Sequence, residues 1–181
     1  MNVSKVILEK LAQGNHDAFH MVFKTFYAKV YNFALGLVKN EADADDIVQI
    51  VFLKIWLKRA KLTEVKNLDT YIYTITKNTV LNFFSARKDY HSDISKVSTL
   101  HIGNESPIEQ IEAQDLQLMI DMVVSNMPPQ RQTIYRMSRE EGLSNEEIAT
   151  KMGIQKKTVE NHLNLALKDI RKLLKILILF F

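Results

Sequence analysis

The chain has 181 residues, of which 46% are hydrophobic and 25% charged, so a globally disordered or fibrous protein is excluded. Cysteine is absent, which excludes disulfide frameworks, thiol catalysis and cysteine-ligated zinc. With only five glycines and three prolines, long helices are favoured over sheets, and no apolar stretch approaches the roughly 20 residues of a membrane span.

The net charge of +3 is distributed unevenly along the chain. Residues 1–88 hold 13 Lys and Arg against 8 Asp and Glu, a net charge of +5. Residues 89–127 hold 1 against 7, a net charge of −6, and residues 128–181 hold 10 against 6, a net charge of +4. Each basic segment can therefore bind a polyanion, whereas the acidic segment between them cannot.

The first 88 residues predict four helices. Apolar side chains recur at helical spacing from Val3 to Leu11 and again from Phe19 to Val38, with Gly14 and Asn40 as the stops. A third helix follows Glu41, and its apolar pairs one turn apart predict a deep core stripe. These pairs are Ile47/Val48, Val51/Phe52 and Ile55/Trp56. After a short loop, a fourth helix begins with Asn67 or Asp69 as its cap and runs to Arg87 and Lys88.

Residues 89–107 lack periodicity and are rich in polar residues, which indicates a linker and hence two domains, 1–88 and 108–181. The second domain is predicted to hold helices at about 108–126, from Pro128 to Glu141, from Ser144 to Gly153, and from about Gln155 onward. The expected fold class is all-α, with two small helical domains.

The segment 143–162 carries the strongest motif, a helix-turn-helix. Ser144 and Glu147 form a capping box, and Gly153 provides the turn. The apolar residues of the two helices are expected to pack on one another: Ile148, Ala149 and Met152 against Val159 and Leu163.

The face of the last helix opposite Val159 is predicted to carry Lys157, Asn161, Asn164 and Lys168. Lysines suit phosphates and amides suit base edges, so this face is typical of a helix in a DNA major groove. The alternative is an ordinary solvated helix face.

Two further clusters lie in the first domain. The acidic cluster Asp43, Asp45 and Asp46 allows three interpretations: a Mg²⁺ site, complementation of the helix dipole, or a protein-docking surface that is acidic at one end and apolar along its edge. In the fourth helix, aromatic residues alternate with cations and amides, which suits stacking on unpaired bases; Phe83 and Phe84 are expected in the core. The five histidines show no metal-ligand spacing, so neither a metal nor a cofactor is predicted.

Three stretches, in the same order along the chain, resemble the extracytoplasmic-function sigma factors of RNA polymerase. Residues 41–56, "EADADDIVQIVFLKIW", resemble the segment that binds the polymerase clamp helices, and residues 68–88 resemble the promoter-melting and minus-10 helix. Residues 143–172 resemble the minus-35 helix-turn-helix. The style of the sequence is similar to members from Bacteroides-like bacteria.

The resemblance implies three sets of site residues. Those that bind polymerase, or support the helix that does, are Asp43, Asp45, Asp46, Gln49, Phe52 and Trp56. Those that contact the minus-10 element are Arg59, Lys61, Tyr73, Lys77, Asn78, Asn82 and Arg87, with the loop 59–67 holding a flipped base. Those that contact the minus-35 element are Lys156, Lys157, Thr158, Asn161, His162, Asn164 and Lys168.

The implied partners are core RNA polymerase, through its beta-prime clamp and beta flap, promoter DNA, and a membrane-bound anti-sigma factor. We expect a cytoplasmic protein that is not an enzyme and has no small-molecule substrate. A stand-alone helix-turn-helix regulator is the main alternative, and an all-helical Mg²⁺-dependent enzyme a more distant one. The apolar end, residues 176–181, is expected to be covered either by the chain's own domains or by a partner.

Overall fold

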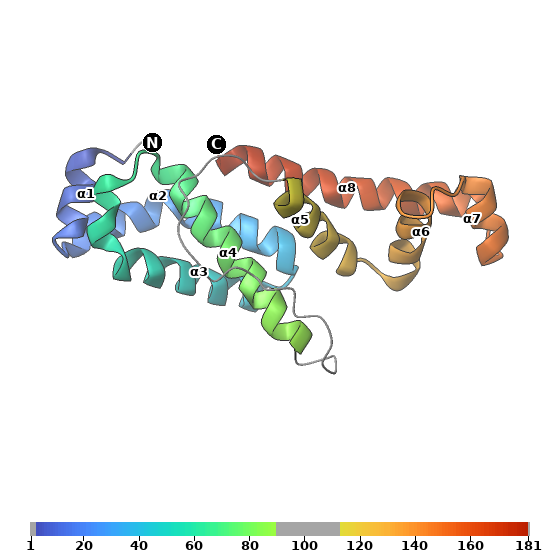
Figure 1. Cartoon of the computed structure of the whole chain (residues 1–181), viewed down its shortest axis with the longest axis horizontal. Coiled ribbons are helices and arrows are strands. Elements are labelled where there is room, and N and C mark those ends of the chain that lie inside the picture. Colours follow the sequence, from blue (N-terminus) through green and yellow to red (C-terminus); the bar gives the residue numbers. More distant parts are fainter. Residues whose placement is uncertain (1–2, 90–112, 181) are drawn as a thin grey trace. The chain divides into compact units, whose positions relative to one another are not determined.

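The computed structural model describes residues 3–89 and 113–180, and every described element is helical (Figure 1). In chain order these elements are α1 (Lys5–Ala12), α2 (His16–Val38), α3 (Glu41–Leu57), the 3₁₀ helix η1 (Arg59–Glu64), α4 (Leu68–Asp89), α5 (Ala113–Ser125), α6 (Pro129–Arg139), α7 (Asn145–Met152) and α8 (Lys156–Phe180). None of the described helices is long and apolar enough to cross a bilayer.

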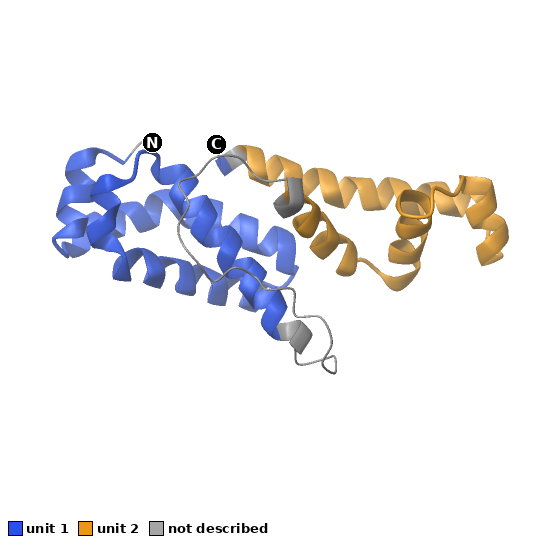
Figure 2. Cartoon of the chain, viewed as in Figure 1, with its two compact units in different colours: residues 1–110, 179–181 blue, residues 111–178 orange. Residues whose placement is uncertain are grey.

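The chain divides into two compact units, residues 1–110 with 179–181, and residues 111–178 (Figure 2). The predicted fold class, all-α with two small helical domains, is confirmed. The predicted linker from residue 90 onward, and the first part of the helix predicted at about 108–126, lie outside the described residues. The predicted domain bounds stay predictions.

The core of the first unit is built on α3, which packs against α2 and α4. Five of the six predicted core residues of α3 are buried, with Ile47, Val51 and Ile55 fully so, while the sixth, Trp56, is half-buried. The sequence predicts a short loop after α3, but this segment forms η1 instead. It packs against α1 and buries Leu62 completely. A single apolar residue in a polar stretch gives no periodicity, so the sequence pattern could not reveal this turn.

Asparagine side chains begin three helices of this unit. Asn15 Oδ1 accepts from the Ala18 N–H at 2.9 Å, Asn40 Oδ1 from the Asp43 N–H at 3.0 Å, and Asn67 Oδ1 from the Thr70 N–H at 3.1 Å. The cap of α4 is therefore Asn67 and not Asp69. The Asp69 carboxylate instead accepts from Lys29 Nζ at 2.5 Å, which ties the start of α4 to α2.

One hydrophobic cluster of the second unit lies around the helix-turn-helix. Its buried residues are Ile134, Ile148, Ala149 and Val159, with Met137, Leu143, Met152, Ile154 and Leu163 packed against them. The predicted packing of α7 on α8 is thereby confirmed. So is the capping box of Ser144 and Glu147, and Gly153 ends α7 with a positive φ of 65°. Arg131 of α6 pairs with Asp169 of α8 at 3.1 Å, which fixes α6 against α8.

Candidate polymerase-binding and nucleic-acid-binding surfaces

The acidic end of α3 is open to solvent. Asp45, Asp46 and Gln49 are exposed, and Asp43 is half-buried in the first turn, where the helix dipole favours negative charge. Phe52, by contrast, is only 4% exposed, and its ring lies 4.6 Å from that of Phe23. Phe52 therefore supports α3 from the core side, and its ring is not part of the open face.

The open face of α3 has the apolar edge expected from the sequence, on residues that the sequence pattern did not identify. Ile50, Leu53 and Leu57 are 41%, 56% and 67% exposed. At 100° per residue they share one face of α3 with Asp46 and Gln49, opposite the buried core face of the helix. We call these three side chains the α3 stripe. The signal was present in the sequence, since a helix that is apolar on two opposite faces can bury only one of them against its own domain.

The end of α3 is held by an aromatic cluster. The Trp56 ring stacks on His16 with centroids 5.0 Å apart and meets Phe19 edge-on at 5.2 Å. The Arg59 guanidinium lies 4.7 Å from the Trp56 ring centroid, and its Nη1 donates to the Trp56 carbonyl at 3.0 Å. Arg59, predicted to contact DNA, thus already has a structural role at the α3–η1 junction.

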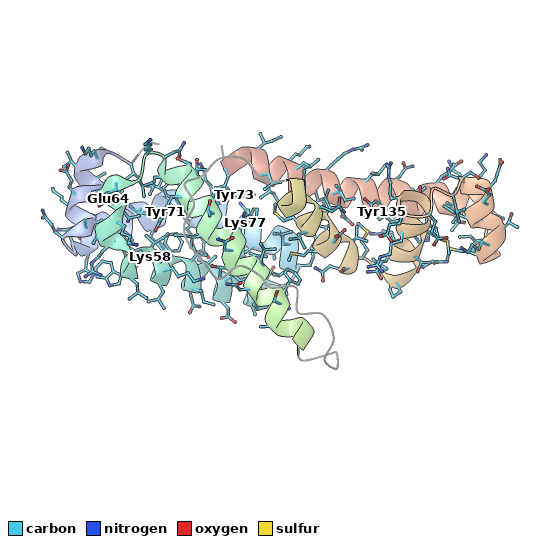
Figure 3. All side chains as sticks on the ribbon, viewed as in Figure 1. Lys58, Glu64, Tyr71, Tyr73, Lys77 and Tyr135 are labelled. Atoms are coloured by element: carbon cyan, nitrogen blue, oxygen red, sulfur yellow. The ribbon has the colours of Figure 1, made fainter. Side chains whose placement is uncertain are left out.

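The outer face of α4 presents amides. Asn78 and Asn82 are exposed one turn apart. Tyr71 and Lys77, labelled in Figure 3, lie on the same helix and are half-buried. Tyr73 differs, because it is only 3% exposed and its ring packs edge-on against Phe33 at 5.6 Å. A buried ring cannot stack on a base, so the ring of Tyr73 belongs to the core and is not available to DNA. The side chain of Arg87 lies outside the described ones.

A lysine fixes the seam between α3 and α4. Lys54 Nζ donates to Thr79 Oγ1 at 2.9 Å, and Thr79 Oγ1 donates in turn to the Ile75 carbonyl at 2.7 Å. Burial, and to a lesser extent the neighbouring Lys58, lower the pKa of Lys54. This bond joins the helix that carries the open face, α3, to the helix that carries the amides, α4.

A cavity of about 660 Å³ lies beside η1 and the start of α4. Its lining combines apolar and polar side chains: Val3, Lys5, Leu8, Phe26, Thr63, Glu64, Val65, Lys66, Asn67, Leu68 and Asp69. Lys61 lies on η1 and is exposed. Across the described part of the chain, no group of three or more His, Asp or Glu side chains is placed to hold a metal ion.

The recognition face of α8 has the predicted exposure. Lys157, Asn161, Asn164 and Lys168 are exposed, while Val159 is fully buried on the opposite side. Of the other predicted contact residues, Lys156 is exposed and Thr158 and His162 are half-buried. The His162 Nδ1 is shielded from solvent without a hydrogen-bond partner, so at most the other edge of its ring is available to a ligand.

Both units match known families. Residues 22–90 match the family model of sigma-70 region 2, and residues 117–170 match that of sigma-70 region 4. The chain is 29% identical over 138 residues to the RNA polymerase sigma factor SigZ of Bacillus subtilis, covering 76% of this chain and 72% of SigZ. It is 24% identical to the ECF RNA polymerase sigma-E factor of Haemophilus influenzae, over 88% of both chains. In a solved structure titled "Structure of CnrH in complex with the cytosolic domain of CnrY", a chain aligns over 96% of this one and 98% of its own length, at 17% identity and a TM-score of 0.44.

The two regions, in this order on one chain, define a sigma factor of RNA polymerase. The chain belongs to the extracytoplasmic-function group of that family. It is accordingly an alternative sigma factor, which binds core RNA polymerase and directs promoter-specific transcription initiation. A stand-alone helix-turn-helix regulator does not account for the region 2 match of the first unit.

Proposed function

We propose that the open face of α3 is the surface that binds core RNA polymerase, through its beta-prime clamp. The α3 stripe supplies apolar area, and Asp45, Asp46 and Gln49 form a polar rim on it. The observation that carries this proposal is the exposure of Ile50, Leu53 and Leu57, at 41–67%, on a helix whose opposite face is fully buried. An apolar patch rimmed by polar residues is typical of a protein–protein interface.

The amide face of α4 then contacts the minus-10 element. Asn78 and Asn82 can bond to base edges, and Lys77 lies beside them to contact phosphate. The cavity beside η1 receives one unstacked base, since its walls combine apolar side chains with the polar groups of Thr63 and Glu64. Capture of exposed bases, rather than hydrolysis, provides the free energy of melting.

The second unit binds the minus-35 element through α8. Lys156, Lys157 and Lys168 meet phosphates, and Asn161 and Asn164 read base edges in the major groove. Neither unit offers a large DNA-binding surface, so affinity depends on polymerase holding both, which raises the effective concentration of the second after the first has bound.

This assignment places the protein in the cytoplasm, where polymerase and DNA are. Polymerase performs the chemistry, and the chain is not itself an enzyme. A membrane-bound anti-sigma factor is the partner that would keep it silent, because any protein covering the α3 stripe prevents polymerase from binding it.

A transcription assay tests the proposal. The chain is added to core RNA polymerase on a pool of promoter fragments, and new start sites are mapped. We expect starts at a defined promoter class, and expect Leu53→Asp to abolish them. Val6→Asp is the matched control, because Val6 is 58% exposed on α1, away from α3 in the chain. Equal loss of initiation in both variants would overturn the assignment of α3.

A further inference from the structure

Three lysines of the helix-turn-helix are each engaged by a carboxylate. Lys156 Nζ lies 2.6 Å from Glu146 Oε1, Lys151 Nζ lies 2.8 Å from Glu141 Oε2, and Lys157 Nζ lies 3.2 Å from Glu160 Oε2. The positive charge that this unit presents to a polyanion is therefore partly neutralised within the unit before DNA arrives. Lys168 lies on the outer face of α8 with Lys157. It makes no ion pair within the described residues and serves as an internal reference.

The Glu146–Lys156 pair differs from the other two in position. It joins the first turn of α7 to the first residue of α8, so it links the two helices of the motif. In this motif the N-terminal residues of the second helix lie at the DNA, while the first helix crosses the backbone. A carboxylate bonded to Lys156 is thus brought to the phosphates together with the ammonium group it neutralises.

We infer that Glu146 is a specificity-determining residue, which competes with the DNA backbone for Lys156 and so lowers sequence-independent affinity. The inference rests on the proposed binding of α8 to DNA. Backbone contacts carry no sequence information, whereas Asn161 and Asn164 read bases, so removing one phosphate contact increases the share of affinity that depends on sequence. The pair is exposed, with side-chain exposures of 51% for Lys156 and 75% for Glu146, so DNA can displace it without disturbing the fold.

The test compares Glu146→Gln with Glu140→Gln in the full chain. Both remove one negative charge from the second unit, but Glu140 lies after α6, 3.9 Å from Arg136, and touches no lysine of the motif. The probe is a random-sequence DNA duplex, titrated by fluorescence anisotropy at several NaCl concentrations. We expect Glu146→Gln to bind about threefold tighter, with the slope of log affinity against log salt steeper by about 0.9, and Glu140→Gln to keep the wild-type slope.

A double variant separates competition for Lys156 from general repulsion of DNA by Glu146. If the inference holds, Glu146→Gln gains nothing in a Lys156→Ala background. A gain that persists there, or a slope that Glu146→Gln leaves unchanged, overturns it.

Lys168→Ala distinguishes this failure from failure of the proposed function. If Lys168→Ala reduces the slope by about 0.9 while Glu146→Gln has no effect, α8 binds DNA and only the role of Glu146 is wrong. If neither substitution changes the slope, the binding of DNA by α8 is itself refuted, and the inference with it.

Discussion

Each unit has a helix with one buried face and one open face, and the two open faces differ in composition. In the first unit, α3 buries one face completely and leaves three large apolar side chains of the other face in water. In the second unit, α8 also buries one face, but the opposite face carries lysines and asparagines. Exposed apolar area is stabilised by another protein, and a polar basic face by a polyanion. The composition of the outer face, rather than the fold, therefore distinguishes the surface proposed for polymerase on α3 from the surface proposed for DNA on α8.

The largest expected effect on stability follows from the difference in size between the cores of the two units. Ile55 of α3 and Ile148 of α7 are both fully buried, and truncation of either to alanine costs about 2–5 kcal/mol. The second unit, residues 111–178, is the smaller of the two and buries fewer apolar side chains than the first, and domains of that size have little stability to lose. We expect Ile148→Ala to unfold the second unit at 37 °C and Ile55→Ala to leave the first folded.

Limited proteolysis and thermal unfolding of the full chain follow the two units separately. Thr150→Ala, on the exposed side of α7, is the control and should change little. If Ile55→Ala and Ile148→Ala produced the same loss of protection in their own units, the difference in core size would not matter to stability.

The α3 stripe should respond in the opposite way to the core. Leu53→Ala removes a side chain that is 56% exposed, so we expect unfolding to change by less than about 0.5 kcal/mol. Affinity for core polymerase should fall by about 2 kcal/mol, or roughly 30-fold, as for an apolar residue central to an interface. Titration of labelled chain with core polymerase measures the second quantity, and chemical denaturation the first. A variant that lost stability without losing affinity would assign Leu53 to the core instead.

On α8, amide and lysine should behave differently. Asn161→Ala is expected to change the preferred bases in the minus-35 element, at about 1–3 kcal/mol for the lost contact. Lys157→Ala should weaken binding by the same factor on every promoter, and modestly, because Lys157 is already paired with Glu160. Selection from a randomised minus-35 library, read by sequencing, separates a change of preference from a uniform loss.

Charge reversal at the rim of α3 should have a smaller effect than loss of the stripe. Asp45→Lys and Asp46→Lys together should slow association with core polymerase and weaken its salt dependence, because exposed rim charges act mainly on the encounter. Stopped-flow association at two ionic strengths checks this. An unchanged association rate would show that the acidic end of α3 faces away from polymerase.

The sequence predicted the helix-turn-helix almost completely because local signals coincide there. Ser144, Glu147 and Gly153 mark the ends of α7, and the buried face of α8 follows from the position of Val159. The first unit was predicted less well. Tyr73 was expected at DNA but is buried, and Arg59 is engaged by Trp56, since contacts between residues of different elements leave no periodic signature. Exposure of the α3 stripe likewise depends on where α2 and α4 pack.

The smallest expected effect concerns the helix caps, whose response to pH differs between the two units. In the first unit the caps of α2, α3 and α4 are asparagine amides, which do not titrate. In the second unit the start of α7 depends on a carboxylate: Glu147 Oε2 accepts from the Ser144 N–H at 2.8 Å and from its hydroxyl at 2.7 Å. These two bonds lower the pKa of Glu147 below its ordinary value.

A carboxyl whose pKa is lower in the folded state stabilises the fold above its unfolded pKa, and that contribution is lost as pH falls through the folded pKa. Acidification from pH 7 should therefore loosen the first turn of α7, through its capping box, by more than the first turn of α3, where acidic side chains act on the helix dipole but the cap does not titrate. Amide hydrogen exchange at the starts of both helices measures this, with rates corrected for the intrinsic effect of pH. Ser144→Ala removes the hydroxyl donor and should bring the pKa of Glu147 closer to its ordinary value, which weakens the pH dependence of α7. If α3 and α7 lost protection in parallel, the pH dependence of α7 would not come from the capping box.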